Sequence, residues 1–173
     1  MGESHLKINP SFGITYAVKT HVGNRRSENQ DCYSVLCEDG KQFFTVADGM
    51  GGSQGGATAS AISCTVIPNL IINQDSEFNR EVIRSAIKKA NLEIFRKSIS
   101  DSSCKGMGTT VVSIFSDGQS IYIASIGDSR IYLLDGGHLK QLTKDDSVVQ
   151  DLIDTGTITK AEAKNHPVSH MLT

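Results

Sequence analysis

The chain has 173 residues, of which 38% are hydrophobic and 21% are charged, and its formal net charge is −2. This length and composition are those of one globular domain with its own core, so an intrinsically disordered chain is excluded. The near-neutral charge provides no field that would draw the chain onto nucleic acid or an acidic membrane, and neither is expected as a partner.

Residues 1–12 contain no apolar signal segment, and we expect them to form a flexible leader ahead of a domain that spans residues 13–173. The apolar runs look too short to cross a bilayer. The four cysteines form no Cys-x-x-Cys pair, so we expect reduced thiols that are buried or half-buried. These features together predict a cytoplasmic protein, which we expect to be a monomer.

Three strands are expected in the first part of the domain. Residues 13–23 alternate loosely between apolar and polar side chains, which is typical of a half-buried strand. A second strand is expected over residues 32–39. Residues 43–48 form a short apolar run rich in aromatic and β-branched side chains, which predicts a buried strand that ends at Asp48.

Two helices are expected after the third strand. Residues 57–67 are mostly small or apolar, and Pro68 is expected to end this first helix. A longer helix is expected from about Asn79, because apolar residues recur three and four positions apart: Phe78, Val82, Ile83, Ala86, Ile87, Ala90, Ile94 and Phe95. The basic residues face the other way and are interpreted as a solvated surface: Arg84, Lys88, Lys89 and Arg96.

The second half of the chain changes character. Residues 108–142 contain short strand-like runs, and the turn signals at residues 116–119 and 135–138 predict hairpins between them. Short helices are expected within residues 147–156 and 159–166. Two long helices between two sets of strands predict an α+β fold, with helices packed on an antiparallel sheet.

A carboxylate stands at the mouth of a glycine-rich run, in the sequence ADGMGGSQGG that begins at Ala47. Glycine loops often cradle phosphate, which Asp48 alone would repel. The conflict disappears if a hard dication lies between them, held by the Asp48 carboxylate and by a backbone carbonyl such as that of Gly49. A P-loop is excluded because no lysine follows the glycines. A dinucleotide site is disfavoured because no strand precedes the acid expected about 20 residues further on.

A metal site needs more than one carboxylate, and two further aspartates are candidates. Asp31 ends the polar loop NRRSENQD, and Asp128 follows a strand-like run. Each alone is more typical of a turn residue than of a ligand. Arg26 alone is typical of a surface residue, although its planar guanidinium suits bidentate capture of a phosphate oxyanion.

Taken together, six segments resemble the motifs of the metal-dependent protein phosphatases, the PPM or type 2C family, in its bacterial form. In chain order they are GNRRSENQD, VADGMGG, GTTVV, IGDSRIYLL, LTKDDS and HPVSHMLT, and they cover most of residues 13–173. The resemblance implies an antiparallel β-sandwich flanked by helices, incomplete at its C-terminal end, with a flap-like segment at residues 143–170. It also implies that the chain holds the N-terminal two-thirds of such a domain.

The resemblance further implies hydrolysis of phosphoserine and phosphothreonine by water activated at two Mn²⁺ or Mg²⁺ ions, with a third, weaker metal site. Asp48 matches the aspartate that bridges both ions, Gly49 the carbonyl ligand, and Asp128 the acid of the weaker site. Arg26 matches the phosphate-binding arginine, and Asp31 matches a second-shell acid that holds metal-bound water. The implied partners are phosphorylated proteins, the substrates of an opposing serine/threonine kinase.

The sequence departs from the family pattern in two ways. Met50 stands where animal members carry a histidine, and Ser53 and Asp146 stand where bacterial members carry one. The resemblance also implies two further metal-ligand aspartates, which family members carry in a part of the domain that follows the position of Thr173. A fragment of a longer phosphatase, one half of a split protein and a natural truncation all remain open. The alternative function is a catalytically impaired relative that binds phosphoproteins or regulates a partner, and hydrolysis of a small phosphate ester is a third possibility.

Overall fold

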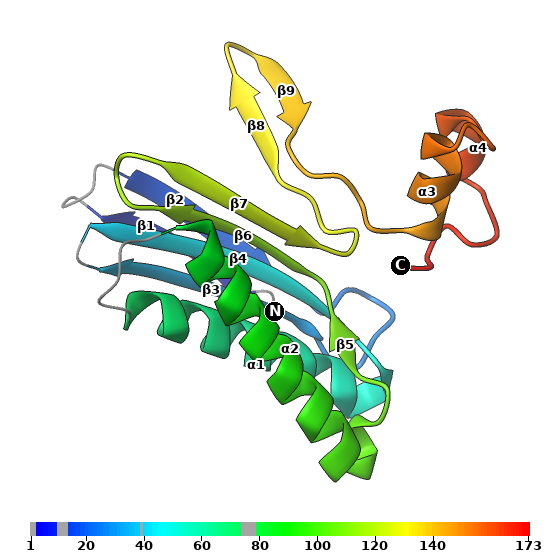
Figure 1. Cartoon of the computed structure of the whole chain (residues 1–173), viewed down its shortest axis with the longest axis horizontal. Helices are drawn as coiled ribbons and strands as arrows, with labels where there is room; N and C mark the ends of the chain where they lie inside the picture. Colours follow the sequence, from blue (N-terminus) through cyan, green and yellow to red (C-terminus); the bar gives the residue numbers. More distant parts are fainter. Residues whose placement is uncertain (1–2, 10–13, 39, 74–78) are drawn as a thin grey trace.

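The computed structural model of the chain describes residues 3–9, 14–38, 40–73 and 79–173. At its centre lies an antiparallel sheet of five strands, shown in Figure 1, in which the order is β3-β4-β6-β7 and the short β5 pairs with β4. The strands are β3 (Asp31–Glu38), β4 (Lys41–Met50), β5 (Gly108–Thr109), β6 (Val111–Ser116) and β7 (Ile121–Ile126). The expected strand over residues 43–48 is confirmed, but β4 runs two residues past Asp48, because Gly49 and Met50 pair with β5.

Two long helices, α1 (Gly52–Ile72) and α2 (Arg80–Ser100), cover one face of the central sheet (Figure 1). Side chains alternate along β4, so Phe43, Thr45 and Ala47 are buried while Val46 and Asp48 are exposed. Phe43 meets Phe115 of β6 edge-to-face with ring centroids 4.8 Å apart. These two rings, Val111 of β6 and the apolar faces of both helices form the main core, to which the helices contribute Ile67, Ile71, Ile83, Ala86 and Ala90.

The first helix is longer than the sequence predicts. Pro68 lies inside α1 and does not end it, and the helix continues to Ile72. A proline inside a helix costs about 3 kcal/mol, but Pro68 is fully buried, and its neighbours Ile67 and Ile71 are part of the core. Burial therefore outweighs the lost hydrogen bond. By length and composition, an 18-residue window of α1 is also apolar enough to cross a membrane. This corrects the expectation that every apolar run is too short to do so. In this structure 50% of the window is buried, as in a core helix.

The second helix begins as expected. The Asn79 side chain accepts hydrogen bonds from the backbone N–H groups of Glu81 and Val82, at 3.0 and 3.2 Å, and so caps the helix. The predicted apolar stripe is confirmed at the buried positions Ile83, Ala86, Ala90 and Ile94. The stripe was wrongly extended to Phe95, which is 58% exposed because its side chain points off the packed face. The expected stripe residue Phe78 lies outside the described residues.

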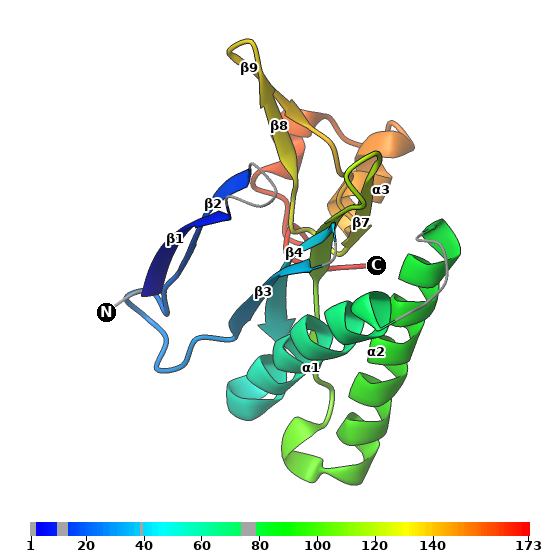
Figure 2. The ribbon, with the colours of Figure 1, turned by 90° about the vertical axis from the view of Figure 1, so that its left-hand side faces the viewer.

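The other face of the sheet is covered only in part. Strands β1 (Glu3–Asn9) and β2 (Ile14–Thr20) form a separate antiparallel pair, with Glu3 opposite Thr20, on the side away from the helices (Figure 2). Tyr16 of β2 contacts Phe44 of β4 edge-to-face, with ring centroids 5.7 Å apart. The expectation of a flexible leader is wrong for residues 3–9, because pairing with β2 satisfies their backbone groups.

A second hairpin, β8 (Tyr132–Asp135) and β9 (His138–Gln141), projects from the rest of the chain (Figure 1). Its strands are exposed throughout, and the leucines at positions 134 and 139 are 68% and 67% exposed. The turns predicted at residues 116–119 and 135–138 are confirmed, and each joins the two strands of a hairpin. The α+β fold, with antiparallel sheets flanked by helices, is therefore confirmed, and the layer opposite the helices consists of two separate hairpins.

The tail forms two short helices, α3 (Val148–Asp154) and α4 (Lys160–Ala163), near the positions that the sequence predicts. Thr159 and Glu162 make a capping box at the start of α4. A role of residues 143–170 as a flap stays a prediction. All four cysteines are free, and they are buried or half-buried as expected: Cys32, Cys37, Cys64 and Cys104.

Candidate functional site

Two of the predicted site residues, Asp31 and Asp48, lie directly opposite each other on β3 and β4. Opposite residues of an antiparallel pair project from the same face of the sheet, so the two carboxylates meet. Partial burial raises the pKa of Asp48, and the charge of Asp31 and a hydrogen bond with it raise the pKa further. The charge of Arg26 acts in the opposite direction and lowers the pKa of Asp48. The structure therefore brings Arg26, Asp31 and Asp48 together.

This arrangement is unfavourable for the protein alone and favourable for a bound cation. Two neighbouring carboxylates cannot both ionise easily unless positive charge comes close to them. The Asp48 side chain is exposed, so a cation can reach it from solvent. An arginine beside a carboxylate pair is also placed to bind an oxyanion that shares the cation. The chemistry of the pair therefore fits the dication that the acid–glycine sequence predicts.

Gly49 is needed because three backbone segments meet around it. Its N–H donates a hydrogen bond to the Gln30 carbonyl oxygen at 3.1 Å, which fixes β4 against the loop before β3. A Cβ atom at this position would lie 2.1 Å from the Gly56 carbonyl oxygen and 2.7 Å from that of Gln30. Gly51 begins α1 in a left-handed conformation with φ +119°, which glycine adopts readily. The glycine-rich run therefore lets α1 start directly beside the carboxylate pair. The role of the Gly49 carbonyl as a metal ligand stays a prediction.

Two hydroxyl groups that sequence reasoning missed hold Asp48 in place. The Asp48 N–H donates to Thr110 Oγ1 at 3.1 Å, and the Thr110 N–H donates to the Asp48 carbonyl oxygen at 2.9 Å. Thr110 Oγ1 also shares a hydrogen bond of 2.7 Å with Ser129 Oγ. Thr110 lies between β5 and β6 and is buried. The sequence shows only a threonine ahead of an apolar run, which does not reveal this contact.

Asp128 reaches the site only through its neighbours. It is exposed and stands next to Ser129, which links it through Thr110 to Asp48. The adjacent Gly127 donates its N–H to Asp146 Oδ2 at 3.0 Å, and the Asp146 N–H donates to the Gly127 carbonyl oxygen at 2.9 Å. These two hydrogen bonds hold the loop after β7 beside the segment that leads to α3. Asp146 thus has a structural role that the sequence did not reveal.

A bidentate ion pair supports the same loop. Arg130 Nε donates to Asp145 Oδ1 at 2.8 Å, and its Nη2 donates to Oδ2 at 2.6 Å. The pair raises the pKa of Arg130 above its usual range. Asp145 is only 11% exposed at its side chain, so this acid is committed to Arg130 and is not available to a metal.

The carboxylates at the site form a pair and not a larger cluster. Within residues 3–9, 14–38, 40–73 and 79–173, no group of three or more His, Cys, Asp or Glu residues lies close enough to hold a metal ion. Asp128 therefore does not complete a set of three with Asp31 and Asp48, and its expected role as a ligand of a weaker site stays a prediction. The described residues therefore place two facing carboxylates at the predicted metal site, and their role as metal ligands stays a prediction.

Comparison with known proteins agrees with these features. Residues 17–151 match the family described as protein phosphatase 2C. The chain belongs to this family. Within it, the serine/threonine phosphatase stp of Listeria monocytogenes is 36% identical over 159 residues, which cover 89% of this chain and 63% of that protein. The serine/threonine protein phosphatase PstP of Mycobacterium tuberculosis is 36% identical over 154 residues, which cover 29% of that protein.

Solved structures of protein phosphatase 2C members share the fold. The M. tuberculosis phosphatase PstP/Ppp matches 100% of this chain with a TM-score of 0.77 and 30% identity. Stp1 of Staphylococcus aureus matches 99% with a TM-score of 0.81 and 27% identity. The catalytic domain of PstP, solved in complex with two manganese ions, matches 94% with a TM-score of 0.71. This chain covers 63% to 66% of those three structures, so it spans about two-thirds of the family domain.

Proposed function

We propose that the chain carries the phosphate-binding part of a protein serine/threonine phosphatase active site, which acts on phosphoserine and phosphothreonine in proteins. The observation that carries the proposal is the convergence of Asp31, Asp48 and Arg26 at one end of the central sheet. Family membership supports it, although the relatives are longer. The partners are then phosphorylated proteins that a serine/threonine kinase modifies. We place the protein in the cytoplasm, where free cysteines persist.

Each side chain has a distinct task in this proposal. Asp48 and the Gly49 carbonyl would hold the Mn²⁺ or Mg²⁺ ions, and Asp31 would orient a water beside them. Such ions, when bound, supply Lewis acidity and an activated water for attack on phosphorus. Arg26 binds a phosphate oxygen through its guanidinium and orients the substrate. Thr110 keeps the Asp48 backbone fixed, so that the carboxylate stays directed at Asp31.

The experiment measures Mn²⁺ binding and turnover separately. We expect calorimetry on the 173-residue chain to detect weak Mn²⁺ binding that Asp48→Ala abolishes. The matched control Asp135→Ala, at the exposed end of β8, is expected to leave binding unchanged. Turnover of p-nitrophenyl phosphate by the short chain is expected to be weak or undetectable, because the described residues offer only a carboxylate pair. Unchanged Mn²⁺ binding by Asp48→Ala would show that the metal site lies elsewhere.

A second function is favoured by the same observation. A site with Arg26 and only two carboxylates among the described residues retains more capacity to bind a phosphate group than to hydrolyse it. A phosphoprotein-binding or regulatory role therefore remains the alternative. Binding of a phosphoserine peptide without turnover, lost in Arg26→Ala, would favour this role, whereas Mn²⁺-dependent release of phosphate from that peptide would favour the enzyme.

A further inference from the structure

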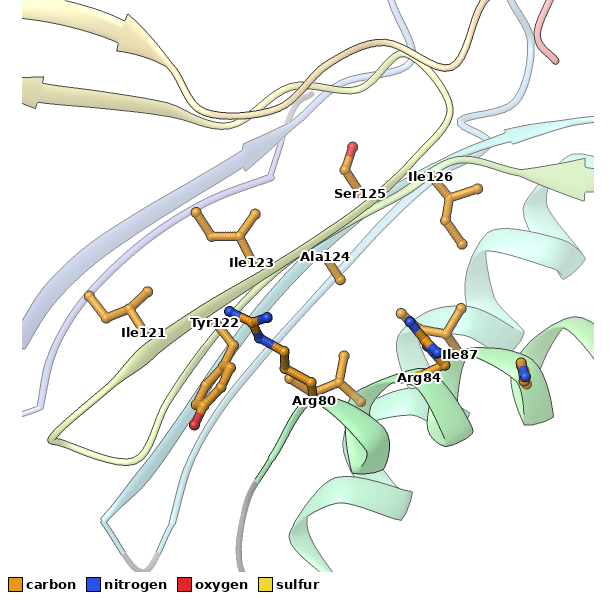
Figure 3. Close-up of a pocket in the computed structure, with 11 residues that line it drawn as sticks. Arg80, Arg84, Ile87, Ile121, Tyr122, Ile123, Ala124, Ser125 and Ile126 are labelled. Carbon is orange, nitrogen blue, oxygen red and sulfur yellow. The ribbon is translucent and has the colours of Figure 1, made fainter.

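A groove of about 730 Å³ runs between the edge strand β7 and the N-terminal half of α2, on the far side of β6 from the carboxylate pair. Figure 3 shows the side chains that line it. Apolar groups form its floor, including Ile83, Ile87 and Tyr122, and three cations of α2 form its rim: Arg80, Arg84 and Lys88. Among the described residues that line the groove, which exclude residues 74–78 just before α2, none is acidic. The groove is therefore apolar at its base and positively charged along one side.

The other side of the groove is a strand whose outer edge is open. In the described part of the chain, β7 pairs with β6 alone, in unbroken register from Ile121 to Ile126. Backbone N–H and C=O groups of an edge strand point outward at every second residue and can pair with another chain. Soluble proteins usually protect such an edge with a lysine, a proline or a bulge, and the sequence IYIASI contains none of these.

The charges on the rim favour an acidic occupant. Arg80, Arg84 and Lys88 are spaced four residues apart, so they lie on one face of α2. Among the described residues, Glu81 lies 3.7 Å from Arg84, but both side chains are largely exposed, at 68% for Arg84 and 75% for Glu81. Exposed ion pairs of this kind contribute little to stability, so Glu81 does not prevent Arg84 from binding a carboxylate of another chain.

The two faces of β7 also determine which side chains an added strand should carry. In Figure 3, Tyr122 and Ala124 point toward α2, whereas Ile121 and Ile123 point away from it. Ile121 and Ile123 are 71% and 40% exposed, so they offer apolar contacts to a strand beside them. Side chains of an added strand alternate in the same way, with one row beside the cations of α2 and the other beside these isoleucines.

We propose that the groove between β7 and α2 binds an extended segment of a partner protein, with alternating acidic and apolar residues, as an additional strand of the central sheet. The binding does not depend on a metal ion or on phosphatase activity. Strand β7 ends at Ile126, two residues before Asp128, and the groove is separated from the carboxylate pair by β6. The groove would thereby recruit a partner by its backbone and its charge.

The test measures binding of a fluorescent eight-residue peptide of alternating valine and glutamate to the 173-residue chain, by anisotropy at low salt in the presence of EDTA. We expect saturable binding, and no binding of the same peptide with lysine in place of glutamate. Reversing two rim charges in the double variant R80E/R84E is expected to weaken binding about tenfold or more. Lys89→Glu reverses one charge on α2 outside the groove, half the change of the double variant, and is expected to change binding less than about twofold.

Strand addition has a second readout that charge attraction alone would not give. We expect N-methylation of alternate peptide bonds to abolish binding in one register and to leave it nearly intact in the other, because only one set of N–H groups faces β7. Equal effects in both registers, or equal losses in R80E/R84E and Lys89→Glu, would overturn the proposal. Concentration-dependent dimerisation that excludes the peptide, measured by sedimentation, would assign the groove to a second copy of the chain and also overturn it.

Discussion

Replacing Gly49 by alanine is expected to destabilise the chain by about 3–4 kcal/mol. The added Cβ atom would lie 2.1 Å from the Gly56 carbonyl oxygen, 2.4 Å from its carbon and 2.7 Å from the Gln30 carbonyl oxygen. All three are backbone atoms, so no side chain can rotate to make room. Ordinary contact begins at 3.4 Å, and α1 would therefore have to move by roughly 1.3 Å from β4.

The magnitude combines two effects. Overpacking in a well-packed region costs about 1–3 kcal/mol, and three backbone clashes place Gly49→Ala at the upper end of that range. The same movement lengthens the hydrogen bond from Gly49 N–H to Gln30, which adds about 1 kcal/mol. Since Gly49 adjoins Asp48, we also expect the variant to lose Mn²⁺ binding in proportion to the displacement of β4.

Urea denaturation followed by circular dichroism measures this cost as a shift in the midpoint at unchanged slope. The control is Gly136→Ala in the turn between β8 and β9, where φ is +52° and no atom lies within 4 Å of the new Cβ. That change costs only the left-handed backbone strain of about 1 kcal/mol. If Gly49→Ala lowered the midpoint no more than Gly136→Ala, the close approach of β4, α1 and the loop before β3 would be wrong.

Three further predictions concern the support of the site, the core and an ion pair. Thr110→Val is expected to cost about 1–3 kcal/mol in urea denaturation, because the Asp48 N–H loses its side-chain acceptor while the side-chain volume is kept; a neutral effect would contradict the role of this hydroxyl. Phe115→Ala is expected to cost about 3–5 kcal/mol, whereas Phe95→Ala, at an exposed position, is expected to cost far less, and similar values would contradict the assigned core. The Lys97 ammonium, 2.8 Å away, holds the pKa of Asp101 below its usual range, so the pair stabilises the fold above about pH 4 and the contribution is lost as the pH falls through the lowered pKa. The stability difference between the natural chain and Lys97→Met should therefore shrink in acid, and a difference that grows on acidification would refute this assignment.

The candidate site could be predicted largely from the sequence because its central residues lie close to one hairpin. Asp31 and Asp48 occupy facing positions of β3 and β4, so local pairing alone brings them together. Arg26 belongs to the loop that leads into β3. The hydroxyl groups of Thr110 and Ser129 were not predictable, since their contact depends on how β6 and the loop after β7 pack across the sheet.

The fold shows the same division between local and tertiary causes. The positions of β2, β3 and β4, the start of α2 near Asn79 and the hairpin turns follow from local chemistry, and the sequence predicted them. Pro68 inside α1 and the ordered residues 3–9 were missed, because burial and pairing with distant residues override local preference there. Periodicity also placed Phe95 on the buried face, although its side chain points off that face while the adjacent Ile94 is packed against Cys104 and Met107.

The projecting hairpin of β8 and β9 has a consequence for local stability. The base of the hairpin is closed by the Leu142 N–H, which donates to the Ile131 carbonyl oxygen at 2.8 Å, and by the Ile131 N–H, which donates to Thr143 Oγ1 at 3.1 Å. An isolated two-stranded hairpin is only marginally stable in water. Its amide protons should therefore exchange with deuterium through local opening, well before those of β4 and β6, which exchange only when the whole sheet unfolds.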